Sequence, residues 1–475
     1  MRGGVEPQAK RRMIFPTVEF AIFFPIVLAL SWALMPYPAV WKPFILVASY
    51  IFYGAAGWRF CILLAVVTLG NQAAARFLGR TEAPRARKAI LGGALVLDLG
   101  VLVVFKYYGF FATQINAALD SLGLGFSAPL VALAIPLGVS FFTFQAISYV
   151  VDVYRRTIEP GRLVDVALYL SFFSHIVAGP IVRAREFLPQ LATPRSPRNV
   201  PVGAAVGLIA LGLIKKVVIA DLLARSLVDP VFAVPQAYAA PDVALACYGY
   251  AAQIFCDFSG YTDIAIGTAL LMGFVFPQNF HRPYGALGFQ EFWRRWHMTL
   301  SRFLRDFLYI PLGGSRGGRL FTARNLMLTM LLGGLWHGAA WTFVLWGALH
   351  GAALVAERQF RGWARLPGWL RWVITFHVVV LAWILFRSPD LTIAGNILAQ
   401  LVTPGPATLW TAPVVLAVVA VVGLQLVPER WIEAFRLRVE ALNPVALGFG
   451  LATVIMIVGA TVPSEGVPPF IYFQF

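Results

Sequence analysis

His337 is the histidine whose surroundings in this sequence best suit a base, and His297 lies in the most charged segment of the chain. His297 lies in a charged, aromatic segment, FWRRWHMTLSRFLRDFLYIPLGG, and His337 lies forty residues later in an apolar segment, LWHGAAWTFVLWGALHG. A neutral imidazole with an ordinary pKa of about 6.5 can accept a proton from a hydroxyl group near neutral pH, which suits acyl transfer to an alcohol. Gly333, Gly334 and Gly338 surround His337, and they allow a second backbone or a substrate to approach it closely.

The other four histidines are interpreted mainly as structural residues. His281 is expected to fix the loop QNFHRPYG, and His377 lies in an apolar run without polar neighbours. His175, in SFFSHIVAGP, is compatible with either role. His350 lies thirteen residues beyond His337 and either faces the same cavity or packs against a neighbouring helix; packing is the simpler interpretation.

Motifs for other chemistries are missing from the sequence. It contains no H-E-x-x-H motif and no His/Cys cluster with the spacing of metal ligands, so no metal site is predicted. It also lacks the G-x-S-x-G serine elbow, the P-loop and the dinucleotide-binding fingerprint. Nucleotide hydrolysis and hydride transfer therefore have no support.

The composition is that of a polytopic membrane protein. The chain has 475 residues, of which 59% are hydrophobic and 13% charged, with a mean hydropathy of +0.75, whereas a soluble domain is about one-quarter charged. A helix needs about 20 apolar residues to cross a bilayer. Continuous apolar runs predict roughly eleven spans, and exclude an outer-membrane barrel. The candidate ranges are 17–35, 41–56, 58–78, 89–111, 135–153, 165–182, 202–225, 242–274, 325–354, 370–386, 411–428 and 444–462.

The net charge of +16 comes mainly from arginines that lie between the apolar runs. This distribution is typical of short cytoplasmic loops and does not indicate nucleic-acid binding. Arg80–Lys88 and Arg316–Arg324 are predicted to be cytoplasmic loops. No long polar linker interrupts the chain, so residues 1–475 are expected to form a single membrane domain.

The segment Gln290–Leu308 must position His297. Its pattern is helical, with Trp293, His297 and Ser301 four residues apart and therefore on one face, but it is too charged to cross lipid alone. It is either an interfacial helix or a re-entrant element that lines a tunnel.

Several long motifs in this order resemble those of the membrane-bound O-acyltransferase (MBOAT) family. The similarity is closest to the branch that O-acetylates bacterial polysaccharides such as alginate. It is strongest over residues 135–355, and IVAGPIVRAREFLPQL and the terminal PPFIYFQF extend it. The central motifs are Asp257–Gly267, Pro277–Tyr284, Phe292–Gly314 and Leu335–Gly351.

The resemblance implies an all-α membrane enzyme with roughly eleven transmembrane helices and re-entrant or interfacial helices around a central tunnel. Such an enzyme of the bacterial inner membrane would move an acetyl group from a cytoplasmic thioester, acetyl-CoA, to the outer side, without a bound cofactor. An extracytoplasmic SGNH-type acetyltransferase or polysaccharide-modification complex would be its partner.

The resemblance also assigns roles to residues. The family's near-invariant histidine falls on His337 and its second active-site position on His297. We expect His337 to act as general base and His297 to orient the thioester or stabilise the oxyanion. Arginines suited to a phosphorylated donor are Arg294, Arg295, Arg302, Arg305, Arg316 and Arg319. Residues expected to line the tunnel are Trp293, Ser301, Trp336, Trp341, Asp257 and Tyr261.

Other functions remain open at this level. Within the family, D-alanyl transfer to teichoic acids and acetylation of cellulose or peptidoglycan are alternatives. A polysaccharide transporter without enzymatic activity is an alternative from another class. The absence of a convincing internal repeat and the block of histidines and arginines both argue against the transporter.

Overall fold

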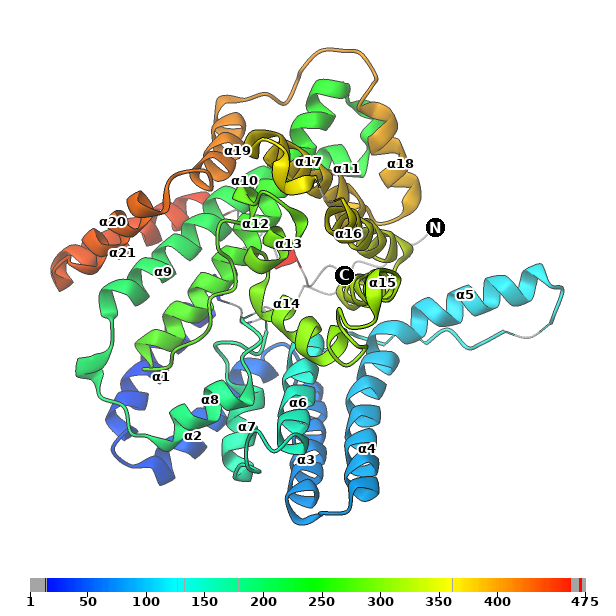
Figure 1. The fold of residues 1–475 in the computed structure, drawn as a ribbon. Coiled ribbons are helices and arrows are strands. Elements are labelled where there is room, and N and C mark those ends of the chain that lie inside the picture. The colour runs from blue at the N-terminus through cyan, green and yellow to red at the C-terminus, as the bar shows by residue number, and fades with distance from the viewer. Residues whose placement is uncertain are drawn as a thin grey trace, which may run out of the picture. The chain divides into compact units, whose positions relative to one another are not determined.

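The computed structural model describes residues 13, 15–125, 127–131, 133–177, 179–360, 362–462 and 470–471. Every regular element in these ranges is a helix, which confirms the predicted all-α fold (Figure 1). A helix satisfies its own backbone hydrogen bonds, as an apolar surrounding requires. The described helices form two compact units. That residues 1–475 make up a single membrane domain stays a prediction.

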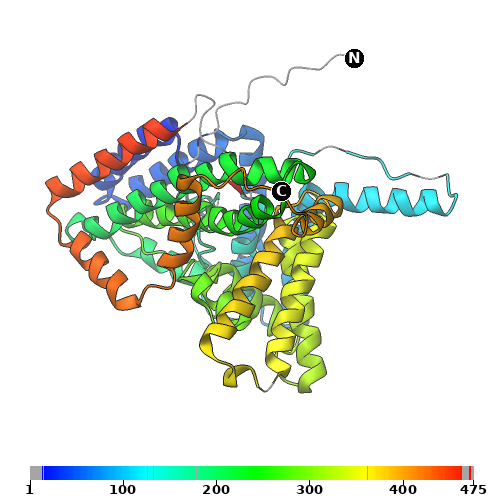
Figure 2. The same cartoon turned by 90° about the horizontal axis from the view of Figure 1, so that it is seen from above.

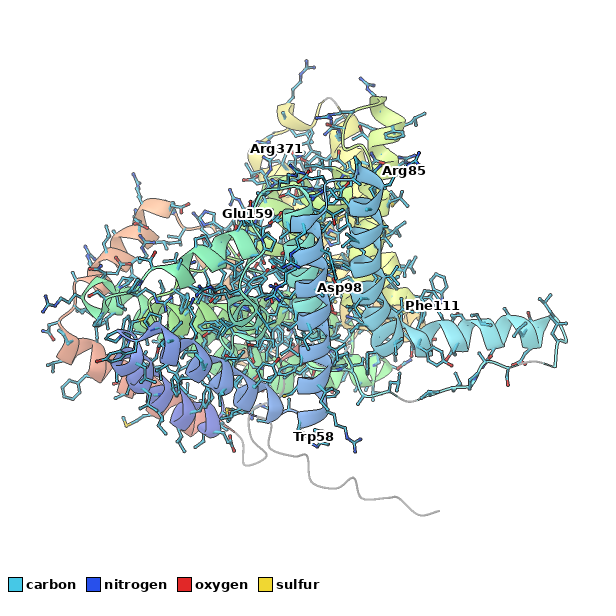
Figure 3. All side chains as sticks on the ribbon, turned by 90° about the horizontal axis from the view of Figure 1, so that it is seen from below. Trp58, Arg85, Asp98, Phe111, Glu159 and Arg371 are labelled. Atoms are coloured by element: carbon cyan, nitrogen blue, oxygen red, sulfur yellow. The ribbon has the colours of Figure 1, made fainter. Side chains whose placement is uncertain are left out.

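Unit 1 comprises the described residues of Met1–Phe105, Ala132–Val200 and Ala269–Phe274. In it, α3 and α4 run antiparallel, and Figure 3 marks Trp58 and Arg85 at opposite ends of this pair. The buried Asp98 on α4 accepts a hydrogen bond from Asn71 on α3 at 2.7 Å. The helices of unit 1 are α1 (Val18–Leu34), α2 (Pro38–Gly54), α3 (Trp58–Arg80), α4 (Pro84–Leu102), α6 (Val139–Tyr154), α7 (Leu163–Ser171) and α8 (Ala184–Ala192).

Unit 2 comprises the described residues of Lys106–Val131, Pro201–Thr268 and Val275–Phe475 and contains all the predicted catalytic residues. Its α15, α16 and α17 lie side by side (Figure 2). The main helices are α5 (Tyr108–Ser121), α9 (Val202–Leu213), α11 (Asp229–Ala233), α12 (Ala240–Leu271, its last residues in unit 1), α13 (Phe289–Arg295), α14 (Met298–Leu304), α15 (Gly318–His337), α16 (Trp341–Gln359), α17 (Gly368–Arg387), α18 (Leu391–Gln400), α19 (Ala412–Leu424), α20 (Glu429–Glu440) and α21 (Pro444–Thr461).

Long apolar helices make this a multi-pass membrane protein. Five helical stretches of the described chain are long and apolar enough to cross a membrane, or six if α19 and α20, which meet at a 103° bend, form one span. The predicted count of roughly eleven is not confirmed, because runs such as those of α1 and α6 form helices of only 17 and 16 residues. The five are Trp58–Arg80, Pro84–Ser121, Val202–Ala233, Gly368–Arg387 and Pro444–Thr461.

Glycines let α15 and α16 cross closely. A methyl group at Gly334 of α15 would lie 2.3 Å from the carbonyl oxygen of Phe343, and one at Gly347 of α16 would lie 2.3 Å from that of Met330. Carbon atoms cannot approach backbone oxygens this closely without displacing a helix. The two glycines therefore fix the distance between α15, which ends at His337, and α16, which begins shortly after it.

Buried charges tie distant parts of unit 2 together. The Nζ atom of Lys216 lies 2.6 Å from Oδ1 of Asp257 and 3.0 Å from Oδ1 of Asp221, and all three side chains are at most 5% exposed. The other carboxylate oxygen of Asp257 accepts a hydrogen bond from the backbone N–H of Ile471 at 3.0 Å. Lys216 thus compensates two carboxylates that burial would otherwise make costly.

We predict that Lys216→Met lowers the free energy of unfolding by about 3–5 kcal/mol, because it leaves Asp221 and Asp257 buried without their cation. The control is Arg436→Met, which removes a cation that is 61% exposed and paired with Glu433 on α20; it should change stability by less than about 1 kcal/mol. Unfolding of the purified protein in mixed micelles measures both. Equal stability of the two variants would contradict the compensating role of Lys216.

Candidate active site

His297 lies in a break between two short helices. α13 ends at Arg295, Trp296 is extended, and His297 adopts a left-handed conformation with φ 41° and ψ 55° before α14 begins at Met298. This conformation is rare for a residue other than glycine and concentrates at functional sites. The imidazole is fully buried, with its ring centre 4.6 Å from that of Phe258 on α12.

The prediction of one continuous helix from Gln290 to Leu308 is therefore wrong, and Trp293, His297 and Ser301 do not share a helical face. The break is fixed by Asn279, whose backbone oxygen accepts the N–H of Met298 at 2.9 Å. The side-chain oxygen of Asn279 accepts the N–H of Thr299 at 3.2 Å and its hydroxyl at 2.9 Å. Asn279 thus bonds the first N–H groups of α14, which have no partner within the helix.

His337 is the last residue of α15, since Gly338 is extended and α16 begins at Trp341. The predicted run 325–354 is accordingly two helices. The His337 side chain is buried among rings, with centre-to-centre distances of 5.0 Å to Trp346 of α16 and 5.2 Å to Phe386 of α17. Neighbouring helices therefore hold the imidazole from two sides.

The two predicted catalytic histidines meet at one indole ring. The ring centre of Trp336 lies 6.1 Å from that of His297 and 5.0 Å from that of His337. Burial, and then the charges of His297, Lys106 and His350, hold the pKa of His337 well below its ordinary value. The two histidines are forty residues apart in the sequence, and the fold of unit 2 brings them together.

His350 belongs to the same aromatic group as His337. The sequence leaves two interpretations open, a position in this cavity or packing against a neighbouring helix, with packing as the simpler one. The ring centre of His350 lies 4.8 Å from that of Trp346 and 5.0 Å from that of Trp293. It is fully buried, and neither ring nitrogen has a hydrogen-bond partner among the residues that the structure describes.

Lys106 is a contact of the site that sequence reasoning missed. Its Nζ atom donates hydrogen bonds to the carbonyl oxygens of Trp336 at 2.5 Å and His337 at 3.0 Å. The signal in the sequence was a single cation within the apolar run 89–111.

The residues predicted to line a tunnel fall into four groups. Trp293 and Trp336 contact the histidines, whereas Ser301 donates a hydrogen bond to the carbonyl of Trp296 at 3.3 Å. Tyr261 contacts the buried Phe470, 4.8 Å between ring centres, and Asp257 holds the adjacent residue. The structure places Trp341 elsewhere: it is 51% exposed and donates to Gln114 of α5 at 3.0 Å.

Most of the predicted donor-binding arginines reach the surface of unit 2. Arg295 pairs with Glu291 on α13, Arg302 is half-buried on α14, and Arg305 lies 2.6 Å from Asp306. The exposed guanidinium groups are accessible to a polyanion, whereas Arg295 is tied to its own helix. The exposed members of the set are Arg294, Arg305, Arg316 and Arg319.

Burial sets the protonation of the site. It lowers the pKa of His297 to about 3, so this imidazole is neutral at neutral pH and has one N–H to donate. Within the described ranges, no group of three or more His, Cys, Asp or Glu side chains is placed to hold a metal ion. The chemistry available at the site is that of buried, neutral imidazoles among aromatic rings.

Known proteins are similar in sequence to this chain over most of its length. A protein named probable alginate O-acetylase AlgI from Pseudomonas syringae pv. tomato is 44% identical over 362 residues, 74% of this chain and 68% of that protein. The Azotobacter vinelandii protein of the same name is 42% identical over 410 residues, 84% and 79% of the two chains. The peptidoglycan O-acetyltransferase of Helicobacter pylori is 36% identical over 400 residues, 77% and 74% of the two chains.

The sequence model of the membrane-bound O-acyltransferase family, MBOAT, matches residues 134–387, more than half of the chain. The matched range contains Asn279, His297, His337 and His350, and so the break and the aromatic group described above. The chain therefore belongs to the membrane-bound O-acyltransferase family.

Proposed function

We propose that the protein moves an acetyl group from acetyl-CoA on the cytoplasmic side of a bacterial inner membrane to the outside, where a polysaccharide such as alginate becomes O-acetylated. The observation that carries the proposal is the meeting of His297 and His337 at Trp336. The names of the relatives, alginate O-acetylase and peptidoglycan O-acetyltransferase, support acetyl as the group and a cell-envelope polymer as its destination.

In the proposed reaction, His337 accepts the proton of an acceptor hydroxyl as its oxygen attacks the carbonyl carbon of the thioester. The C–S bond then breaks, and the leaving thiolate takes this hydroxyl proton from the His337 imidazolium, which gives a free thiol and an ester. The thioester is already activated, so the step needs no metal and no nucleotide. Trp346 and Phe386 restrict the orientations open to the His337 ring.

His297 has a different role in this proposal. A fully buried neutral imidazole carries one N–H group that can donate a hydrogen bond. We infer that its N–H stabilises the negative charge on the thioester oxygen in the transition state. The left-handed turn fixed by Asn279 keeps that N–H in place before the substrate arrives.

Acetyl-CoA carries several negatively charged phosphate groups, so the protein needs cations where it binds this donor on the cytoplasmic side. The exposed Arg294 and Arg319 are suited to that contact, because guanidinium groups bind phosphate in a forked geometry. On the outer side, an SGNH-type acetyltransferase or a larger modification complex would receive the acetyl group and pass it to the polymer.

Reconstitution of the purified protein in nanodiscs separates this proposal from its alternatives. Release of CoA from acetyl-CoA in the presence of an acceptor and the partner enzyme supports it. Turnover only with a D-alanyl carrier protein indicates teichoic acid D-alanylation instead. Polysaccharide movement across a proteoliposome without thioester turnover indicates a transporter.

We predict that His337→Ala lowers acetyl transfer by at least about 100-fold, because the proton of the acceptor hydroxyl then has no base. Radiolabelled acetyl transfer in nanodiscs measures the loss. The control is His377→Ala on α17. The Nδ1 atom of His377 lies 2.7 Å from the carbonyl oxygen of Val373, one turn earlier on the same helix, so this variant should retain activity. Full activity of folded His337→Ala protein would overturn the assignment of the base.

For His297, Ala and Asn should differ. His297→Ala removes the hydrogen-bond donor and should lower kcat by about 100- to 1,000-fold. His297→Asn keeps a side-chain N–H, and asparagine tolerates the left-handed backbone found at this position, so it should recover part of that loss. Single-turnover measurements compare the two variants. Equal kcat for Ala and Asn would contradict hydrogen bonding as the role of His297.

The arginines should affect donor affinity alone. Arg294→Gln combined with Arg319→Gln should raise the KM for acetyl-CoA severalfold but leave the KM for S-acetyl-N-acetylcysteamine, which lacks phosphate, unchanged. Arg436→Gln on the exposed α20 is the matched control and should alter neither value. Equal effects on both donors would show that these cations do not contact phosphate.

A further inference from the structure

Lys106 makes an unusual contact with the end of the helix that bears His337. It lies in η1 (Val103–Tyr107), a five-residue π-helix in which no other charged residue occurs. Its Nζ atom donates hydrogen bonds to the carbonyl oxygens of both Trp336 and His337, at 2.5 and 3.0 Å. It also lies 5.7 Å from the centre of the Trp336 ring.

Helix ends explain why these contacts matter. The last carbonyl groups of an α-helix have no N–H partner within the helix and carry the negative end of its dipole. At the end of α15, Gly338 offers only a long hydrogen bond of 3.4 Å to Gly334. A lysine ammonium supplies both the missing donors and a positive charge at this point.

The location of Lys106 also needs an explanation. A lysine within an apolar run costs free energy in a membrane unless it is paired, and the flanking residues are Phe105 and Tyr107. The two carbonyl contacts compensate for that cost.

We propose that Lys106 is a positioning residue that fixes the end of α15, so that the ring of His337 and the indole of Trp336 keep their places beside His297. Lys106 acts through the backbone carbonyls and the indole that it contacts. Its effect on catalysis rests on the proposed function; its effect on the helix end does not.

The test compares Lys106→Met, which keeps the length of the side chain but removes its donors and charge, with Lys106→Arg, which keeps both. Gln114→Met is the control, because it removes a contact of the neighbouring α5 with the exposed Trp341. Hydrogen–deuterium exchange of the backbone amides around residues 333–340 reports on the helix end in nanodiscs, whether or not the protein turns over. Steady-state kinetics with acetyl-CoA report on catalysis.

We expect Lys106→Met to exchange faster at the end of α15 and to lose about 10- to 100-fold in kcat with an unchanged KM for acetyl-CoA, as misplacement of a catalytic group does. Lys106→Arg should restore protection and most of kcat, and Gln114→Met should match the wild type. If Lys106→Met does not fold, Lys106→Gln serves in its place.

Unchanged exchange in folded Lys106→Met would overturn the proposal. So would a loss of kcat that Lys106→Arg does not restore at all, or a loss confined to KM. If the wild-type protein shows no acetyl transfer but Lys106→Met still exchanges faster, the proposed function fails while the fixing of the helix end stands.

Discussion

The structure depends on one constraint: in an apolar surrounding, the backbone N–H and C=O groups must find hydrogen-bond partners inside the chain. At the candidate active site this requirement determines the backbone. Asn279 takes the N–H groups at the start of α14, and the chain can therefore break at His297 and turn through a left-handed residue. An unbroken helix through His297 would have used those N–H groups itself and pointed the imidazole elsewhere.

The close crossing of α15 and α16 supplies the second half of the site. Gly334 and Gly347 bring the two backbones together, and His337 lies at the end of one helix with Trp346 on the other. Packing against aromatic rings on α16 and α17 then restricts the orientation of His337. A ring held by aromatic neighbours keeps its position while its nitrogens exchange protons, which suits a residue that acts as a base.

The sequence predicted what depends on composition and local pattern, and missed what depends on tertiary partners. The apolar runs predicted an all-helical membrane protein, and glycines around His337 indicated a close helix crossing. The helical periodicity of Gln290–Leu308 was real, but a hydrogen bond to Asn279, in a separate motif, overrode it. Lys106 was missed for the same reason, since its partners are 230 residues away.

The order in which the chain is made sets a limit on when the site can be complete. Phe258, which packs against His297, also packs against Phe470 at 5.4 Å between ring centres, and the neighbouring Ile471 bonds to Asp257. Residues 470 and 471 are synthesised more than 170 residues after His297. During translation the nascent protein therefore contains both histidines before it contains the residues that pack behind Phe258, and the docking of this late segment onto α12 must follow the synthesis of the rest of the site.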